Sequence, residues 1–279
     1  ASLSPRRLQL YNSSDQKSIC ELNFMDSILN VKLNKKRLVV ALEYKLHIFD
    51  ISTMKVLQAI ETTANPKGLI GLSMNEETNS YVAYPWSSEA GTGDVVVIDA
   101  ISLHKVSVIK AHKTVLTCLA FSSDGTRLAT ASQKGTVIRV FSIPESRLVY
   151  TLRRGNTAAS IYSLNFNMQA NLLCASSATG TVHIFKLASE TKKHKEGRGV
   201  GSISDTLSNM WDNHRDFARF SVKADTSVKT VCVISNGDTQ VMVATEDGYL
   251  FQYGLDPING GTCRLEKEYR LLDSNHTAI

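Results

Sequence analysis

The sequence predicts an all-β fold of the β-propeller type, and three observations support this prediction. Short segments that alternate apolar and polar residues begin at residues 46, 95, 138, 182 and 250, so that the first four are spaced by 43 to 49 residues. Their period of two is that of strands, not the 3.6-residue period of helices. Glycine-containing turns join neighbouring segments. Units of four short strands at this spacing are typical of propeller blades.

Each repeat contains predicted strands in the same order. The first strands are expected at residues 28–33, 68–73, 116–121, 161–166 and 230–235. The second strands are expected at residues 37–42, 80–85, 127–132, 172–177 and 240–245. The third strands are expected at residues 46–50, 95–99, 138–142, 182–186 and 250–254. A fourth strand follows in the first three units, as at residues 55–61 and 147–153.

The chain begins with part of a further unit. Residues 6–12 and 17–24 are predicted to form the last two strands of an earlier blade, which makes about five and a half blades in total. An open ring leaves two blade faces exposed to water. We therefore expect N-terminal residues that complete this blade to precede the sequence, and we expect residues 1–279 to form a single propeller domain.

The composition is that of a globular protein with a substantial core. The 279 residues are 43% hydrophobic and 20% charged, and the formal net charge of +5 permits an anionic partner without requiring one. The five cysteines are scattered singly, which favours buried thiols in a reducing compartment over disulfides or zinc sites. No apolar run approaches the length of a transmembrane helix, so we expect a cytosolic protein.

The sequence contains no recognisable catalytic motif. It has no nucleophile elbow, no zinc-protease motif and no phosphate-binding glycine loop that opens a helix. His47 and His183 each alternate with apolar residues on a predicted strand, where a histidine is more often a structural hydrogen-bonding group than a ligand. We therefore predict that the protein is not an enzyme and binds no metal and no cofactor.

Polar residues gather around the segment Arg153-Arg154-Gly155. Two sets of residues take equivalent places in successive units: Ser132, Thr136 and Arg139 in one, and Ser177, Thr181 and His183 in the other. The arginine pair lies between them in the chain. Because neighbouring side chains of a strand point to opposite faces, one arginine can face each set.

These residue types suit a phosphate ligand. Arginine binds phosphate through two parallel hydrogen bonds, hydroxyl groups donate single bonds, and a histidine adds a donor that is charged when protonated. The alternative is that the serine and threonine side chains bond to backbone groups within the blade. The combination of both sets with the arginine pair favours two adjacent anion sites.

One unit, residues 111–141, resembles a WD-repeat blade, with His112 in the usual loop position and a Ser-Asp-Gly turn. The segment "LRRG" followed by "SIYSLNF", together with "TVHIFKL", "SPRRL" and "GLDPINGGTC", resembles the PROPPIN family, the WIPI-type autophagy propellers. The resemblance covers nearly the whole chain. It implies a seven-bladed WD-like propeller, of which this chain lacks part of the N-terminal blades.

The resemblance also implies two phosphoinositide sites on the rim, for phosphatidylinositol 3-phosphate (PtdIns3P) and phosphatidylinositol 3,5-bisphosphate (PtdIns(3,5)P2). By position, the first site would contain Ser132, Gly135, Thr136, Arg139 and Arg153. The second would contain Arg154, Gly155, Ser177, Thr181 and His183. The protein would then act on autophagosome precursor, endosomal or vacuolar membranes as a peripheral protein.

An insertion at about residues 188–220 points to membranes independently. A basic tract with Lys192 and Lys193 leads into "SISDTLSNMW". There, four apolar residues have the spacing of one helix face: Ile203, Leu207, Met210 and Trp211. A basic tract before a short amphipathic helix is typical of an interfacial anchor. The alternative is a helix that packs on the propeller itself or pairs with a partner.

The resemblance implies protein partners as well. In fungal relatives the region that matches Pro5 and Arg6 engages a lipid-transfer protein of autophagosome growth. Animal relatives use basic residues to bind an adaptor of the lipidation machinery, and here Lys35 and Ser52 occupy two such positions. We expect a phosphoinositide effector that is monomeric in solution. A WD-type scaffold that binds acidic peptides is the alternative, and nucleic-acid binding is disfavoured because no aromatic residues interleave with the basic ones.

Overall fold

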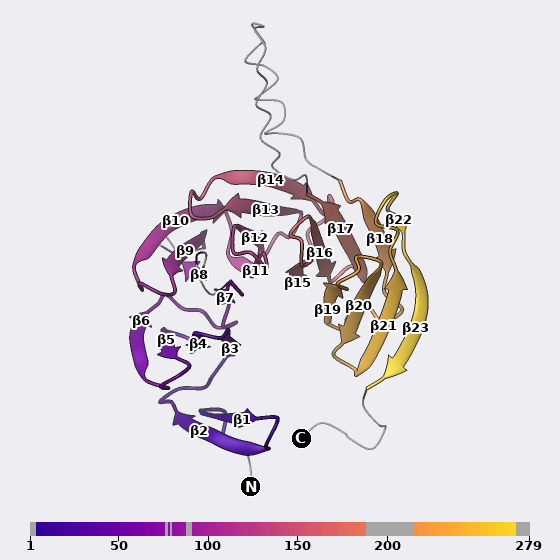
Figure 1. The fold of residues 1–279 in the computed structure, drawn as a ribbon. Helices are drawn as coiled ribbons and strands as arrows, with labels where there is room; N and C mark the ends of the chain where they lie inside the picture. The colour runs from indigo at the N-terminus through magenta and orange to yellow at the C-terminus, as the bar shows by residue number, and fades with distance from the viewer. Residues whose placement is uncertain (1–3, 76–77, 79, 88–90, 188–214, 272–279) are drawn as a thin grey trace, which may run out of the picture. The chain divides into compact units, whose positions relative to one another are not determined.

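The computed structural model describes residues 4–75, 78, 80–87, 91–187 and 215–271 of the chain. In these ranges all regular secondary structure is β, as Figure 1 shows, and no helix is long and apolar enough to span a bilayer. The strands divide between two compact units, residues 1–113 and 114–279, which are described in turn.

The first unit contains three antiparallel sheets. Their orders are β1-β2, β3-β4-β5-β6 and β10-β9-β8-β7. The strand bounds are β1 Arg7–Asn12, β2 Lys17–Asn23, β3 Asn30–Leu33, β4 Arg37–Ala41, β5 Lys45–Asp50, β6 Val56–Glu61, β7 Gly71–Leu72, β8 Tyr81–Trp86, β9 Gly93–Asp99 and β10 Lys105–His112. The β1–β2 sheet confirms the two strands predicted at residues 6–12 and 17–24. The strand expected at residues 68–73 is shorter than predicted, since only two of its residues pair.

The core of the first unit lies on both faces of β4. Leu38 and Val40 pack with residues of β1 and β2, whereas Val39 and Ala41 pack toward β8 and β9. All four side chains are at most 1% exposed. A central strand that is buried on both faces reads as a continuous apolar run, which explains the sequence of this segment.

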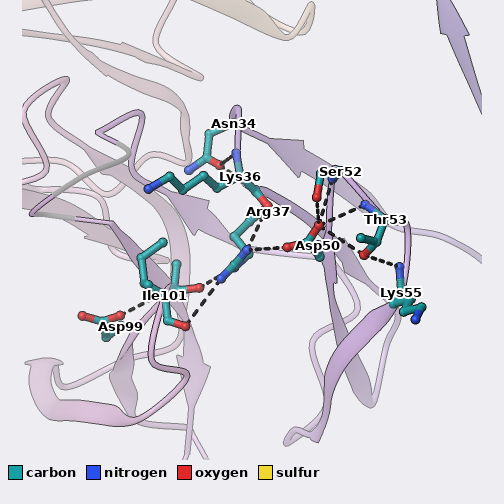
Figure 2. A network of polar contacts seen from close by, with 10 residues as sticks. Asn34, Lys36, Arg37, Asp50, Ser52, Thr53, Lys55, Asp99 and Ile101 are labelled. Carbon is teal, nitrogen blue, oxygen red and sulfur yellow. Dashed lines mark hydrogen bonds and ion pairs between the residues drawn. The ribbon is translucent and has the colours of Figure 1, made fainter.

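A polar network joins two sheets of this unit at Arg37 (Figure 2). The Arg37 side chain donates from Nε to the carbonyl of Ala100 at 2.6 Å and from Nη1 to Asp50 Oδ2 at 3.3 Å. Hydrogen bonds from the Ser52 hydroxyl and the Thr53 backbone lower the pKa of Asp50 to about 2. This arginine therefore ties the start of β4 to the turn after β9.

The second unit also contains three sheets. Their orders are β11-β12-β13-β14, β15-β16-β17-β18-β22 and β19-β20-β21-β23. The strand bounds are β11 Leu116–Phe121, β12 Arg127–Ser132, β13 Val137–Ser142, β14 Leu148–Arg153, β15 Ile161–Phe166, β16 Leu172–Ser177, β17 Thr181–Lys186, β18 Ala218–Ser221, β19 Thr230–Ile234, β20 Gln240–Thr245, β21 Tyr249–Gly254, β22 Gly261–Thr262 and β23 Arg264–Arg270. The periodicity of the sequence did not predict β18, β22 or β23.

Apolar side chains fill the space between successive sheets of the second unit. Ile138 and Leu152 from the first sheet pack with Leu173 and Phe185 from the second, and all four are fully buried. A separate cluster joins the second sheet to the third. Leu152 of β14 and Phe185 of β17 both lie in the first of these two clusters. The same two strands carry residues of the candidate site.

Candidate functional site

The arginine pair lies where β14 ends. Leu152 is opposite Ile138 and Arg153 is opposite Val137 in the β13–β14 pairing. Because Leu152 points into the core toward the second sheet, Arg153 lies on the other face of its sheet. The Arg153 side chain is exposed, and both Nε and Nη2 donate to Asn156 Oδ1, at 3.0 and 2.6 Å.

Arg154 follows directly and is only 6% exposed. Its Nε donates to the carbonyl of Gly135 at 2.9 Å, and its Nη2 donates to the carbonyl of Thr157. Burial lowers the pKa of Arg154, but arginine remains charged at any physiological pH. The two bonds use two of the five N–H donors of the guanidinium group. Arg154 is therefore a buried cation whose acceptors, within the described residues, are backbone carbonyls rather than carboxylates.

A cleft of about 240 Å³ opens beside this arginine, and we call it the Arg154–His183 cleft. It is lined by Arg153, Arg154, Gly155, Asn156, His183, Arg215, Asp216 and Arg219. Four guanidinium groups and an imidazole thus surround one carboxylate. Such a surface favours an anion, and arginines suit phosphate in particular because their planar groups match its oxygens.

His183 lies on β17 at the boundary of two clefts. A second opening of about 340 Å³ is lined by Thr181, His183, Arg219, Phe220, Ser221 and Thr262. The pairing of β17 with β18 places His183 opposite Arg219 and Thr181 opposite Ser221. Of the second predicted set, His183 therefore borders both openings, whereas Thr181 borders only the second.

The imidazole of His183 contacts Asp216. His183 Nδ1 lies 3.0 Å from Asp216 Oδ2, and Arg219 Nε lies 3.9 Å from the same oxygen. Burial is the main effect that lowers the pKa of His183, and Arg154 and Arg219 lower it further, whereas Asp216 opposes them. The ring is therefore largely neutral at neutral pH.

Ser177 has a different environment from the other members of its set. It is 2% exposed at the end of β16, where its Oγ lies 2.9 Å from Thr179 Oγ1 and 3.4 Å from the carbonyl of Thr181. These contacts lie within the turn that connects β16 to β17. Its hydroxyl group thus makes contacts within its own turn, as expected from the alternative in which these serine and threonine side chains bond within the blade.

The first predicted set lies around the turn between β12 and β13. Ser132 is 5% exposed, and its carbonyl accepts a hydrogen bond from the Gly135 amide at 2.8 Å. The carbonyl of Thr136 accepts bonds from the amides of Arg154 and Gly155, at 3.0 and 3.3 Å. Arg139 lies two residues after Val137, so it shares a sheet face with Arg153. The two predicted arginines of this set are therefore on one face of the sheet.

Several cleft residues were missed by the sequence prediction, namely Asn156, Arg215, Asp216 and Arg219. The last three lie at the end of the insertion, in or just before β18, a strand that the sequence pattern did not predict. The cluster of charged residues from Arg215 to Arg219 is visible in the sequence and was a usable signal of a polar site. Its relation to His183 depends on strand pairing, which the sequence pattern did not indicate.

The other predicted functional residues lie in two places. Pro5 and Arg6 are exposed next to β1, and their carbonyls accept bonds from the amides of Ile28 and Phe24, both at 2.9 Å. The predicted membrane-insertion residues are outside the described part of the chain; they are Ile203, Leu207, Met210 and Trp211.

Comparisons with known proteins agree with one another. The family model described as PROPPIN matches residues 1–272. Autophagy-related protein 18 of Yarrowia lipolytica is 40% identical over 327 residues, covering 97% of this chain and 81% of that protein.

Solved structures show the same likeness. The complex of KlAtg21 with the coiled-coil of AgAtg16 matches with a TM-score of 0.77 at 27% identity, covering 96% of this chain and 78% of the matched chain. Kluyvelomyces marxianus Hsv2 matches with a TM-score of 0.75 at 16% identity, covering 98% and 81%, which is a likeness of fold alone. Both are β-propellers, and with the four-stranded sheets they confirm the predicted fold.

Proposed function

This chain belongs to the PROPPIN family of non-enzymatic propellers, and from this premise we propose that it is a phosphoinositide effector of autophagy. Its ligands are PtdIns3P and PtdIns(3,5)P2 in membranes. The family membership also confirms the prediction that the protein is not an enzyme.

The observation that carries this proposal is the buried guanidinium of Arg154. A buried cation is costly unless an opposite charge or several hydrogen bonds compensate it. Its two carbonyl acceptors hold it in place at the wall of the Arg154–His183 cleft. A phosphate group in that cleft would supply the compensating charge.

Each of the two proposed sites contains one arginine of the pair and one of the two predicted sets of residues. Arg154 and the second set form one site, with Gly155, Ser177, Thr181 and His183. Arg153 and the first set form the other, with Ser132, Gly135, Thr136 and Arg139. Two headgroup sites act together on one membrane, because the second binding event becomes intramolecular.

Flotation with liposomes tests the proposal. The wild-type protein is expected to float with vesicles that contain PtdIns3P or PtdIns(3,5)P2 and to remain unbound with vesicles of the same composition that lack both lipids. Soluble inositol headgroups are expected to compete. Equal binding to vesicles without these lipids would contradict the proposal, and displacement by an acidic peptide but not by headgroups would favour the scaffold alternative.

The insertion adds a membrane contact to this proposal. Replacing Trp211 with aspartate is expected to weaken vesicle flotation by roughly tenfold or more, because burial of one large apolar side chain contributes about 1.5–3 kcal/mol. Asn209 lies on the polar face of the predicted helix, so Asn209→Asp adds the same charge as a control and is expected to float like wild type. An equal loss of vesicle flotation in both variants would show that the added negative charge, and not the loss of the tryptophan side chain, weakens binding.

Protein partners complete the proposal. The exposed residues Pro5 and Arg6 form the proposed contact for a lipid-transfer protein of autophagosome growth. The solved relative in complex with a coiled-coil makes a coiled-coil adaptor of the lipidation machinery the other candidate partner. The protein would then reside in the cytosol and attach to autophagosome precursor, endosomal or vacuolar membranes.

A further inference from the structure

The Arg154–His183 cleft contains a carboxylate where an anion site would be expected to have none. Asp216 is the one acidic residue among the residues that line it. Its side chain is 16% exposed, and that of its partner His183 is 10% exposed. A carboxylate in this position competes with a phosphate for the same cations, so it requires a physical explanation.

The contact with Asp216 determines which nitrogen of His183 carries the proton. Because Nδ1 lies 3.0 Å from a carboxylate oxygen, the neutral ring keeps its proton on Nδ1 and donates it to Asp216. Nε2 then has only a lone pair, which cannot donate to a phosphate oxygen. Protonation of Nε2 converts the same ring into a donor that carries a positive charge.

The charged groups that face His183 come from two segments. The end of β14 and the residues at β18 contribute Arg153, Arg154, Arg215, Asp216 and Arg219. Burial and the neighbouring arginines lower the pKa of His183, whereas Asp216 raises it. A bound phosphate dianion would add a second anionic group, beside Asp216, close to the ring and favour the protonated form.

This inference rests on the proposed function. We propose that Asp216 is a positioning residue that couples phosphate binding in the Arg154–His183 cleft to protonation of His183, so that affinity for a phosphate monoester rises as the pH falls. The direction follows from linkage: the bound state holds more protons than the free state, so lower pH favours binding. The affinity stops rising once the pH is low enough that His183 is also protonated in the free protein.

The experiment measures binding of inositol 1,3-bisphosphate to the whole chain from about pH 8 to about pH 5, the range over which histidine titrates. The variant His183→Asn keeps an N–H donor for Asp216 but does not titrate, so it corrects for protonation of the probe itself. The wild-type affinity, divided by that of His183→Asn, is expected to rise by about tenfold for each unit by which the phosphate raises the pKa of His183. A ratio that does not change with pH would overturn the inference.

Asp216→Asn provides the second arm. Its amide oxygen still accepts the Nδ1 proton, but the negative charge is lost, so NMR titration without ligand is expected to show a lower pKa for His183 than in the wild type. An unchanged pKa of His183 would overturn the role of Asp216 even if His183→Asn does not fold. This measurement requires no lipid, so it separates failure of the inference from failure of the proposed function.

The source of the phosphate is tested in parallel. Vesicles with PtdIns3P are expected to reproduce the pH dependence, whereas inorganic phosphate is expected to bind far more weakly. Comparable binding of inorganic phosphate would overturn the assignment of the cleft to a lipid headgroup. Wild-type protein that binds neither vesicles nor inositol 1,3-bisphosphate at any pH would overturn the proposed function and this inference with it.

Discussion

Replacement of both Arg153 and Arg154 by threonine is expected to reduce affinity for PtdIns3P vesicles by more than about a hundredfold, since hydrogen bonds to charged groups contribute about 1.5–3 kcal/mol each. Arg153 and Arg154 are assigned to different proposed sites, and both line the Arg154–His183 cleft. The double substitution therefore removes a cation from each proposed site. Threonine is too short to reach the same ligand oxygens.

Arg127 provides the matched control. Its Nη1 donates to the carbonyl of Ala170 at 2.8 Å, and its guanidinium lies 5.9 Å from the ring centre of Tyr150. It thus connects β12 to the turn between β15 and β16 without lining the Arg154–His183 cleft. Arg127→Thr is expected to lower the free energy of unfolding while vesicle binding persists.

Folding must be checked separately in the double variant. Loss of Arg154 leaves the carbonyls of Gly135 and Thr157 without this donor, so we expect a moderate fall in the free energy of unfolding. Circular dichroism and a urea titration measure it. A folded double variant that floats as well as wild type would refute the proposed lipid sites.

Gly135→Ala is expected to lower the free energy of unfolding by about 2–4 kcal/mol, because the residue is both conformationally restricted and sterically enclosed. Gly135 has φ of +58°, in the left-handed region. A Cβ atom there would lie 1.9 Å from the carbonyl oxygen of Ala159. That contact is with backbone, and the Ala159 amide is itself bonded to the Lys134 carbonyl at 3.2 Å. The loop has little room to move away.

Gly155→Ala is the control in the same region. A Cβ atom at Gly155 has no neighbouring heavy atom within 4 Å. Its effect on the free energy of unfolding is expected to be within about 0.5 kcal/mol. Urea denaturation of both variants compares them directly, and similar midpoints would show that the turn tolerates a side chain. Gly135→Ala is also expected to weaken vesicle binding, because the Gly135 carbonyl holds Arg154 in place.

The inner strands were predictable because their sequences carry a direct physical signal. Leu38 to Ala41 in β4 are buried on both faces, so every position is apolar. The outer strand β23 lacks that signal. All seven residues of β23 are exposed, and Arg264 to Arg270 read as a charged surface segment rather than a strand. Their strand conformation depends on pairing with β21, which the pattern of the segment itself does not reveal.

The candidate site was predictable to a similar extent. The repeat singled out Arg154 and His183, and the structure places both at one cleft. It places Arg153 at that cleft too, although the alternation of side chains assigned it to the other set of residues. Ser177 was singled out by the same spacing, but its hydroxyl group contacts its own turn. Spacing in a sequence determines which loop a residue occupies, whereas contacts determine whether its side chain is available.

The sequence by itself determined the all-β class, the repeat of four-stranded units and the position of the arginine pair between two of them. These depend on local periodicity and turn chemistry, which are properties of short segments. Only the tertiary structure decided that Asp216 contacts His183 and that Arg154 is buried against the carbonyl of Gly135. These contacts join residues 33 and 19 positions apart, and they exist because strand pairing and sheet packing bring separate segments together.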